Sequence, residues 1–224
     1  MDWNDFSRII SIHTNTFGND PGYSNWLNNE AWRNYRRGIL KEKDVENIRD
    51  FLKAWKMGRV LGKIVKKHGT EKFISWNIEI ASRTNSLFEL SNSYKFDDKV
   101  LNFAGICPFT LKLFSEISEL LKSTCASKVM HMVNPSLFIM WDVKIRRHWG
   151  CTEDKNGYFN FLMRMKLEYQ ELLTDFSKTY QLPIGESNDK LLQHFYQKTG
   201  RNVSITRWID TYNWTKFTRN EKLP

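Results

Sequence analysis

The sequence predicts an all-α fold. Apolar residues recur at the three- and four-residue spacing of a helix over much of the 224 residues. Strand patterns are weak: residues 72–81 partly alternate between apolar and polar side chains but fit a helix about as well. Apolar residues make up 41% of the chain and aromatic residues 14%, which argues against disorder and is enough for a packed core. We expect one helical domain that spans residues 1–224.

The helices can be predicted in chain order from their apolar spacing. The first covers residues 46–67, where Ile48, Phe51, Leu52 and Trp55 share one face. A second helix begins after Pro108, and a third, long helix begins at the turn Asn156–Gly157. Two shorter helices follow near the end of the chain, around residues 191–195 and 205–212.

The charge of the chain indicates its class of partner. The net charge is +9 and the isoelectric point is about 9.4, which favours polyanions, with nucleic acid ahead of an anionic membrane. Solubility alone is the simpler explanation of such a charge. The first residues lack a basic start followed by an apolar stretch, and no apolar run is long enough for a membrane span. We therefore expect a cytoplasmic monomer without a signal peptide or a membrane partner.

Cysteine spacing excludes the common metal sites. The three cysteines, Cys107, Cys125 and Cys151, are widely spaced and form no CxxC pair. Neither a zinc site nor a cysteine-ligated iron–sulfur cluster is predicted, and we expect reduced thiols and no cofactor.

The segment 31–68 is rich in Lys and Arg, and Trp32, Tyr35 and Trp55 lie among these cations. Aromatic rings among cations suit a nucleic-acid surface, where phosphates are neutralised and bases can stack. A long amphipathic helix with a solvated basic face explains the same pattern equally well.

Residues 123–149 carry the strongest functional pattern. Lys128 and Asp142 are the only charged side chains from Ser123 to Val143, although their neighbours look buried. Buried charges are costly unless they are paired or used. The small residues 123–127 predict a turn between two helices, where a backbone could approach a phosphate closely. The second helix must be short because Asn134–Pro135 cannot continue it.

Asp142 then precedes a strongly basic helix, residues 143–149, and is expected to be its N-cap. Each of these features also has a structural explanation. An aspartate that opens a helix is usually only a cap, and a lysine at a helix start is usually solvated. Lys144, Arg146 and Arg147 could form an ordinary polar face, and His131 could be a core histidine.

The order of turn, lysine, proline break, aspartate and basic helix resembles the helix–hairpin–helix DNA glycosylases. The likeness covers roughly residues 109–150, with Cys125-Ala126-Ser127-Lys128-Val129 similar to the end of the hairpin and Asp142 similar to the catalytic aspartate. Ala126 stands where a hairpin glycine is usual, and the interval from Lys128 to Asp142 is shorter than is typical of the family. The resemblance implies a helical bundle with the active site between two lobes.

The resemblance also implies roles for individual residues. Asp142 would stabilise the sugar cation that forms as the base leaves, and Lys128 could attack the sugar carbon to form a Schiff base. The base would first be flipped out of double-stranded DNA. Phosphates would be bound by residues of the hairpin end and the basic helix: Cys125, Ala126, Ser127, Lys144, Arg146 and Arg147. The pocket for the flipped base would be lined by Trp141 and His131.

The identity of the base stays open at this level. The small size and the SK…NP…WD core are similar to anti-phage defence glycosylases that remove glucosylated hydroxymethylcytosine from viral DNA, which we take as the expected substrate. An 8-oxoguanine repair glycosylase with lyase activity is the alternative. Two other classes remain: a non-catalytic helical DNA-binding module, and a metal-dependent nuclease that would use Asp142-Val143-Lys144 with Glu116 or Glu119.

Overall fold

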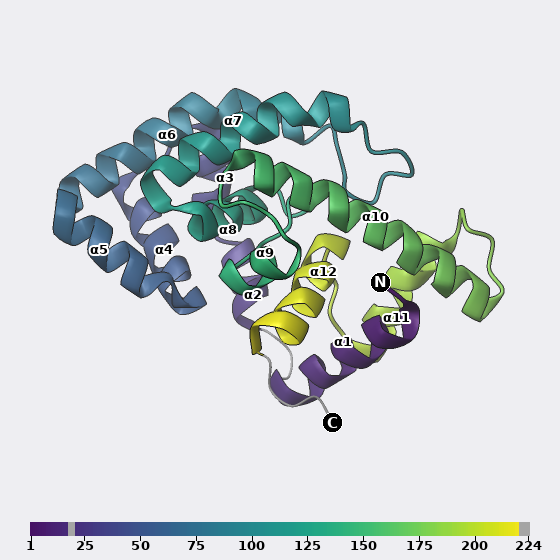
Figure 1. Ribbon diagram of the computed structural model, residues 1–224. Coiled ribbons are helices and arrows are strands. Elements are labelled where there is room, and N and C mark those ends of the chain that lie inside the picture. Colours follow the sequence, from purple (N-terminus) through teal and green to yellow (C-terminus); the bar gives the residue numbers. More distant parts are fainter. Residues whose placement is uncertain (18–20, 220–224) are drawn as a thin grey trace.

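The computed structural model describes residues 1–17 and 21–219, and this part of the chain is helical without any strand, which confirms the all-α prediction (Figure 1). The elements in chain order are α1 (Trp3–Phe17), α2 (Pro21–Leu27), α3 (Glu30–Arg37), α4 (Glu42–Leu52), η1 (Lys53–Met57), α5 (Gly58–His68), α6 (Thr70–Ser91), α7 (Phe103–Leu121), α8 (Ser123–Val133), α9 (Val143–His148), α10 (Lys155–Tyr180), α11 (Ser187–Thr199), α12 (Ile205–Asn213) and η2 (Trp214–Arg219).

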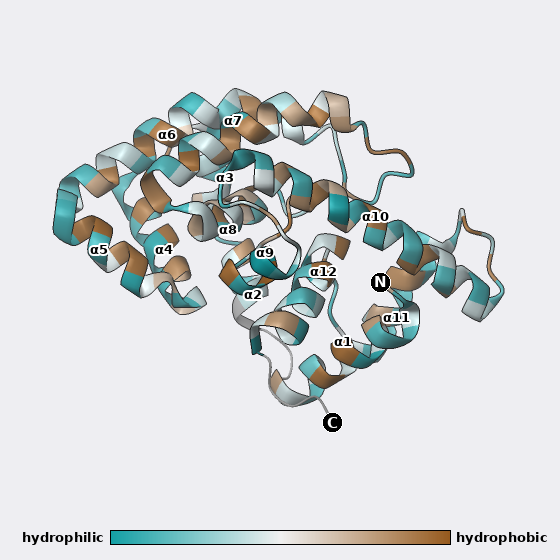
Figure 2. Ribbon diagram, viewed as in Figure 1, coloured by the Kyte–Doolittle hydropathy of each residue, from teal (hydrophilic) through white to brown (hydrophobic). Residues whose placement is uncertain are grey.

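Two groups of helices are joined by the long helix α10. The first group comprises α3 to α8 and contacts α10 through α7 (Figure 1). The second group comprises α1, α11 and α12: α1 and α11 pack against the other half of α10, and α12 packs against α1. Hydrophobic and hydrophilic residues are mixed along each helix, as expected for amphipathic helices that bury one face (Figure 2). The buried hydrophobic residues of both groups form one continuous cluster. None of the helices within the described residues combines the length and apolar character needed to cross a bilayer.

The predicted helix over residues 46–67 is wrong in one respect, because it is broken in the middle. Helix α4 ends at Leu52, and the π-helical segment η1 follows before α5 begins at Gly58. Within η1, Trp55 has φ −89° and ψ 26°, and Lys56 has a left-handed φ of 64°. Such π-helical irregularities often occur at functional sites. Trp55 therefore lies at a break between two helices and not within one continuous helix.

Two other helix starts differ from the prediction. Helix α7 begins at Phe103, not after Pro108, because Asn102 caps it by accepting a 2.9 Å hydrogen bond from the Gly105 amide. Pro108 therefore lies inside the helix. Helix α10 begins at Lys155, where Asp154 accepts a hydrogen bond from the Gly157 amide. The Asn156–Gly157 pair is thus the first turn of a helix, and residues 72–81 are likewise helical within α6.

The predicted turn at residues 123–127 is also wrong, since these residues form the first turns of α8. The connection between α7 and α8 is the single residue Lys122, whose φ of 69° lies in the left-handed region. Its amide donates to Ser118 O at the end of α7, and its carbonyl accepts from the Ala126 amide at the start of α8. The predicted end of the short helix at Asn134–Pro135 is confirmed, because α8 ends at Val133.

A buried non-helical segment, residues 137–141, connects α8 to Asp142. Its five side chains are at most 1% exposed, so its backbone groups need partners inside the protein. Side chains supply them: His131 Nδ1 lies 2.7 Å from Phe138 O, and the Tyr158 hydroxyl donates to Ile139 O at 2.9 Å. These bonds fix the path of the chain into Asp142.

Candidate active site

Asp142 caps helix α9, as predicted. Its Oδ1 accepts hydrogen bonds from the amides of Lys144 (2.8 Å) and Ile145 (2.9 Å). Its Oδ2 accepts a 2.5 Å hydrogen bond from the hydroxyl of Thr218 in η2. The side chain is half-buried. Asp142 is therefore a carboxylate held in a fixed orientation at the boundary between α9 and η2.

Lys128 extends from α8 toward η1. Its ammonium lies 4.8 Å from the centroid of the Trp55 ring, a cation–π distance. Burial lowers the pKa of Lys128, while the negative charges of Asp210 and Asp142 oppose this by favouring the ammonium. An amine with a lowered pKa is a better nucleophile at neutral pH than an ordinary lysine.

A hydrogen-bonded link joins the residues that precede Lys128 and Asp142. The amide of Trp141 donates to Ser127 Oγ at 3.2 Å, and the same hydroxyl lies 3.3 Å from the Trp141 carbonyl. Both groups are buried, so this link is shielded from competing water. The two residues singled out in the sequence are thereby brought into one charged cluster, together with Asp210.

Sequence reasoning missed the other half of this cluster, which comes from α12. Arg207 and Asp210 are 5% exposed each and form a buried ion pair. The Arg207 guanidinium also lies over two aromatic rings, 4.7 Å from the centroid of Tyr23 and 5.0 Å from that of Trp55. Burial raises the pKa of Asp210, and Arg207 and Lys128 oppose that shift. The available signal was an Arg and an Asp three residues apart inside an otherwise buried-looking helix.

Trp55 is the aromatic residue at the centre of the cluster. Its half-buried ring contacts both cations, Lys128 and Arg207, and its centroid lies 5.1 Å from that of the Phe51 ring. The residue lies at the η1 break, which apolar periodicity did not reveal. The other two aromatics of the basic segment, Trp32 and Tyr35, are at most 3% exposed and cannot stack on a nucleic acid.

Comparison with known proteins suggests no function for these residues. No family model, no curated protein and no solved structure matches the chain. The charges and contacts of the cluster are therefore what a functional proposal has to explain.

The predicted contacts of Cys125, Ala126 and Ser127 with DNA stay a prediction for their backbone, because their side chains cannot make them. All three side chains are fully buried on the inner face of α8. Burial raises the pKa of the Cys125 thiol to about 12, so it is unreactive. Ser127 instead serves the link to Trp141 described above.

The predicted base pocket at Trp141 and His131 is not supported either, since both side chains are buried. Trp141 is 1% exposed and packs among Phe114, Tyr158 and Phe161. His131 is enclosed, with Nδ1 beside a carbonyl that can only accept and Nε2 2.7 Å from the Tyr23 hydroxyl. This arrangement requires a hydrogen on Nδ1 and is satisfied by a neutral ring, which agrees with the core-histidine alternative.

The neutral state of His131 predicts a pH dependence of stability. Burial lowers the pKa of His131 from 6.5 to about 3. The neutral ring therefore stabilises the fold fully above pH 6.5, and this contribution is lost as the pH falls toward 3, at about 1.4 kcal/mol per pH unit. Between pH 7 and pH 5, the free energy of unfolding should fall by about 2 kcal/mol more in the wild type than in His131→Asn, which keeps a donor for Phe138 O. Urea unfolding at both pH values measures this, and equal losses would show that the ring is not held neutral.

The three predicted DNA-binding cations of helix α9 have different surroundings: one is held by neighbouring residues and two face outward. The Arg146 side chain is 13% exposed, donates to Glu153 at 3.1 Å and contacts the Cys151 carbonyl. Lys144 is exposed and donates to Thr218 O at 2.8 Å. Arg147 is exposed on the outer face of the helix. The predicted contact with DNA thus remains a prediction for Lys144 and Arg147, whereas the Arg146 side chain is bound to residues 151–153.

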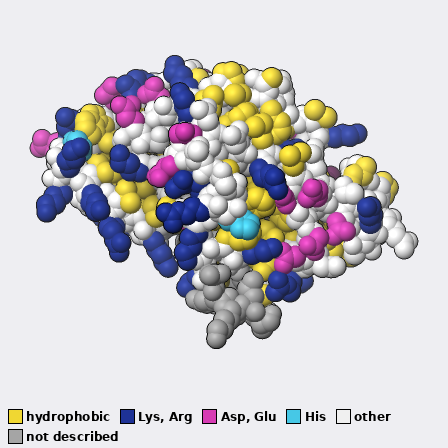
Figure 3. All heavy atoms as spheres, in the orientation of Figure 1, with side chains coloured by type: hydrophobic (Ala, Val, Ile, Leu, Met, Phe, Trp, Pro, Cys, Tyr) yellow, Lys and Arg dark blue, Asp and Glu magenta, His cyan; other side chains and the backbone are white. Residues whose placement is uncertain are grey.

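A strip of exposed cations continues from the cluster along η1 and α5. Figure 3 shows Lys and Arg side chains gathered over α4 and α5 at the lower left of this face. The side chains from η1 and α5 recur at helical spacing and are exposed: Lys53, Lys56, Arg59, Lys63, Lys66 and Lys67.

The acids that a nuclease would need lie elsewhere. Glu116 pairs with Arg83 at 2.7 Å, and Glu116 and Glu119 line a separate groove between α5, α6 and α7. Within residues 1–17 and 21–219, no group of three His, Cys, Asp or Glu side chains is arranged to hold a metal ion.

Proposed function

We propose that the protein is a DNA glycosylase of the helix–hairpin–helix type, in which Asp142 and Lys128 act on the glycosidic bond of a modified base. The observation that carries this proposal is the Ser127–Trp141 link, which brings a fixed carboxylate and a half-buried amine into one cluster beside a strip of exposed cations. The one-residue turn at Lys122 between α7 and α8 supports the proposal, because it stands where the hairpin of such an enzyme would lie.

In this mechanism the bond between C1′ and the base nitrogen breaks, and its electrons leave with the base. Positive charge develops on the sugar, where the Asp142 carboxylate stabilises it. Water then attacks C1′ and transfers its proton to Asp142. In the lyase alternative, the neutral Lys128 amine attacks C1′ in place of water and passes a proton to Asp142. The C1′–O4′ bond then breaks, O4′ takes up that proton as the sugar ring opens, and a protonated Schiff base joins C1′ to Lys128.

The flipped base requires an aromatic contact and access to Asp142. Trp55 takes the place that the sequence suggested for Trp141, because its ring is half-buried and lies beside Lys128. Access requires that the hydrogen bond between Thr218 and Asp142 opens, so η2 must move when DNA binds.

Arg147 tests the DNA-binding side of the proposal. If it neutralises one phosphate, Arg147→Gln should weaken binding to every duplex and lower the salt slope of log K by about one. Lys190→Gln removes one exposed charge from α11, at the other end of the molecule, and is the matched control. Fluorescence anisotropy over a salt series measures both slopes. If the two variants have the same slope, α9 does not contact DNA.

Lys128 separates the two mechanisms. For a lyase, borohydride added during turnover should trap a covalent adduct between enzyme and DNA, and Lys128→Gln should abolish it. Base release without any adduct assigns the attack to water and leaves Lys128 as a charge partner of Asp142.

The substrate we propose is glucosylated hydroxymethylcytosine of phage DNA, with 8-oxoguanine as the alternative. Duplexes that carry one of these bases, or none, should be incubated with the protein and cleaved with alkali, which breaks the strand at abasic sites. Cleavage of the glucosylated duplex alone supports the defence substrate, and cleavage of the 8-oxoguanine duplex alone overturns it in favour of repair.

A non-catalytic DNA-binding module is the second candidate, and one observation favours it. Both Asp142 oxygens already accept hydrogen bonds, which is what a purely structural cap would show. In that case duplex binding would persist and no duplex in the series would acquire an abasic site.

A further inference from the structure

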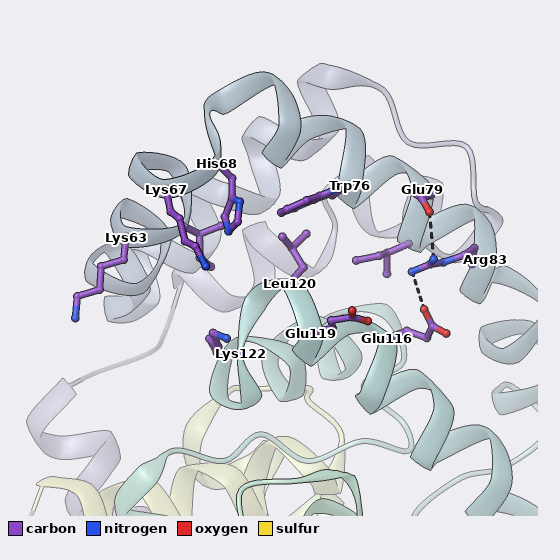
Figure 4. Close-up of a pocket in the computed structure, with 12 residues that line it drawn as sticks. Lys63, Lys67, His68, Trp76, Glu79, Arg83, Glu116, Glu119, Leu120 and Lys122 are labelled. Atoms are coloured by element: carbon purple, nitrogen blue, oxygen red, sulfur yellow. Dashed lines mark hydrogen bonds and ion pairs between the residues drawn. The ribbon is translucent and has the colours of Figure 1, made fainter.

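A groove of about 490 Å³ lies between α5, α6 and α7, and neither Asp142 nor Lys128 lines it (Figure 4). This volume is in the range of small-molecule sites. Its two ends carry opposite charges, and a tryptophan and apolar side chains lie between them.

The first end is cationic. Lys63, Lys67 and His68 come from α5, and Lys122 approaches them from the turn after α7 (Figure 4). Lys122 is held there by its left-handed backbone. Desolvation lowers the pKa of His68, and Lys67, Lys72 and Lys122 lower it further, which reflects the positive potential at this end. The Lys67 and Lys122 side chains lie near each other at this end, whereas the Lys63 side chain extends away from them (Figure 4). Two ammonium groups beside one space suit a phosphate.

The middle of the groove is apolar and aromatic. The half-buried Trp76 ring projects from α6 between His68 and Leu120 (Figure 4). The rings of His68 and Trp76 are 4.8 Å apart, and the Lys72 ammonium lies 4.6 Å from the Trp76 ring. Buried Ile64, Ile80 and Leu120 form the floor. This lining fits a flat, weakly polar ring.

The second end offers fixed hydrogen-bond acceptors. Arg83 bridges Glu79 (3.1 Å) and Glu116 (2.7 Å), which holds both carboxylates in place (Figure 4). The exposed Glu119 carboxylate lies on the same side. Carboxylates accept hydrogen bonds from the exocyclic amino groups of bases such as cytosine.

We propose that this groove binds a nucleotide, with its phosphate at the lysine end, its base against Trp76 and the amino edge of the base toward the glutamates. Inorganic phosphate would leave the aromatic half of the groove unfilled. The nucleotide is either free or the 5′-phosphorylated end of a single strand, since both present the same phosphate and base. The groove is separate from Asp142 and does not depend on the proposed glycosylase activity, although Lys63 and Lys67 also belong to the strip of exposed cations.

Isothermal titration of the full chain with dCMP, a 5′-phosphorylated trinucleotide and inorganic phosphate tests the proposal. The double variant K67Q/K122Q and the single variant Trp76→Leu should each weaken nucleotide binding about tenfold or more. The double variant K190Q/K198Q removes the same charge from α11 and should change nothing. Circular dichroism checks that each variant is folded. Binding of dCMP identifies a free nucleotide, and binding of the trinucleotide alone identifies a strand end.

Three results would overturn the proposal. Neither nucleotide ligand binds at millimolar concentration, phosphate binds as tightly as dCMP, or the control double variant weakens binding as much as K67Q/K122Q. Because Asp142→Asn leaves the groove intact, nucleotide binding by that variant separates a failure here from a failure of the glycosylase proposal.

Discussion

Asp142→Asn is expected to lower the rate of base release at least about a hundredfold, which corresponds to about 2.7 kcal/mol of transition-state stabilisation. Asparagine can still accept from the Lys144 and Ile145 amides, and the Thr218 hydroxyl can turn to accept from its amino group. The fold should therefore survive while the charge is lost. Duplex binding should persist or tighten, because repulsion between the carboxylate and phosphates is gone.

Thr218→Val is the matched control for this variant. It removes the hydrogen bond to Oδ2 but keeps the negative charge, so base release should stay within about tenfold of the wild type. Asp142→Ala should cost about 1 kcal/mol of stability through the lost cap. If the Asn variant releases base at the wild-type rate, catalysis lies elsewhere. An unfolded Asn variant would make Asp142 a structural residue.

The second large effect concerns the buried pair on α12. Arg207→Met or Asp210→Leu should each lower the free energy of unfolding by about 3–5 kcal/mol, because each leaves its partner charge in a desolvated site. The double variant should regain much of this loss, since two apolar side chains replace two charges. Urea unfolding of the four proteins completes the double-mutant cycle.

An additive cycle would show that the stability contributed by each side chain does not depend on the other, which would contradict this expectation. A strongly coupled cycle supports a role for α12 in setting the charge around Lys128, because Asp210 and Arg207 act on its pKa in opposite directions.

Sequence features that span only a few adjacent residues predicted the positions of several helices, one helix end and one helix cap. Apolar spacing identified α7, α10, α11 and α12 but not α1, α2 or α3. Asn134–Pro135 identified the end of α8, and Asp142 before a basic segment identified the α9 cap. Each depends on a few adjacent residues, so the sequence was sufficient.

The remaining features depend on contacts between distant residues. A single left-handed residue, Lys122, makes the turn between α7 and α8, so the small residues after it were free to pack inside the protein. The η1 break is invisible to an apolar stripe that continues across it. The Arg207–Asp210 pair is 65 or more residues from Asp142 in the chain and reaches Lys128 only through tertiary packing.

The most direct measurement of the central claim is mass spectrometry of the products from a duplex with one glucosylated hydroxymethylcytosine. A glycosylase that uses Asp142 should release the free modified base and leave an equal amount of abasic strand, and Asp142→Asn should yield neither at a comparable rate. Release of a modified nucleotide would indicate a nuclease. A duplex that is bound and recovered intact, with each of the bases tested, would contradict the account.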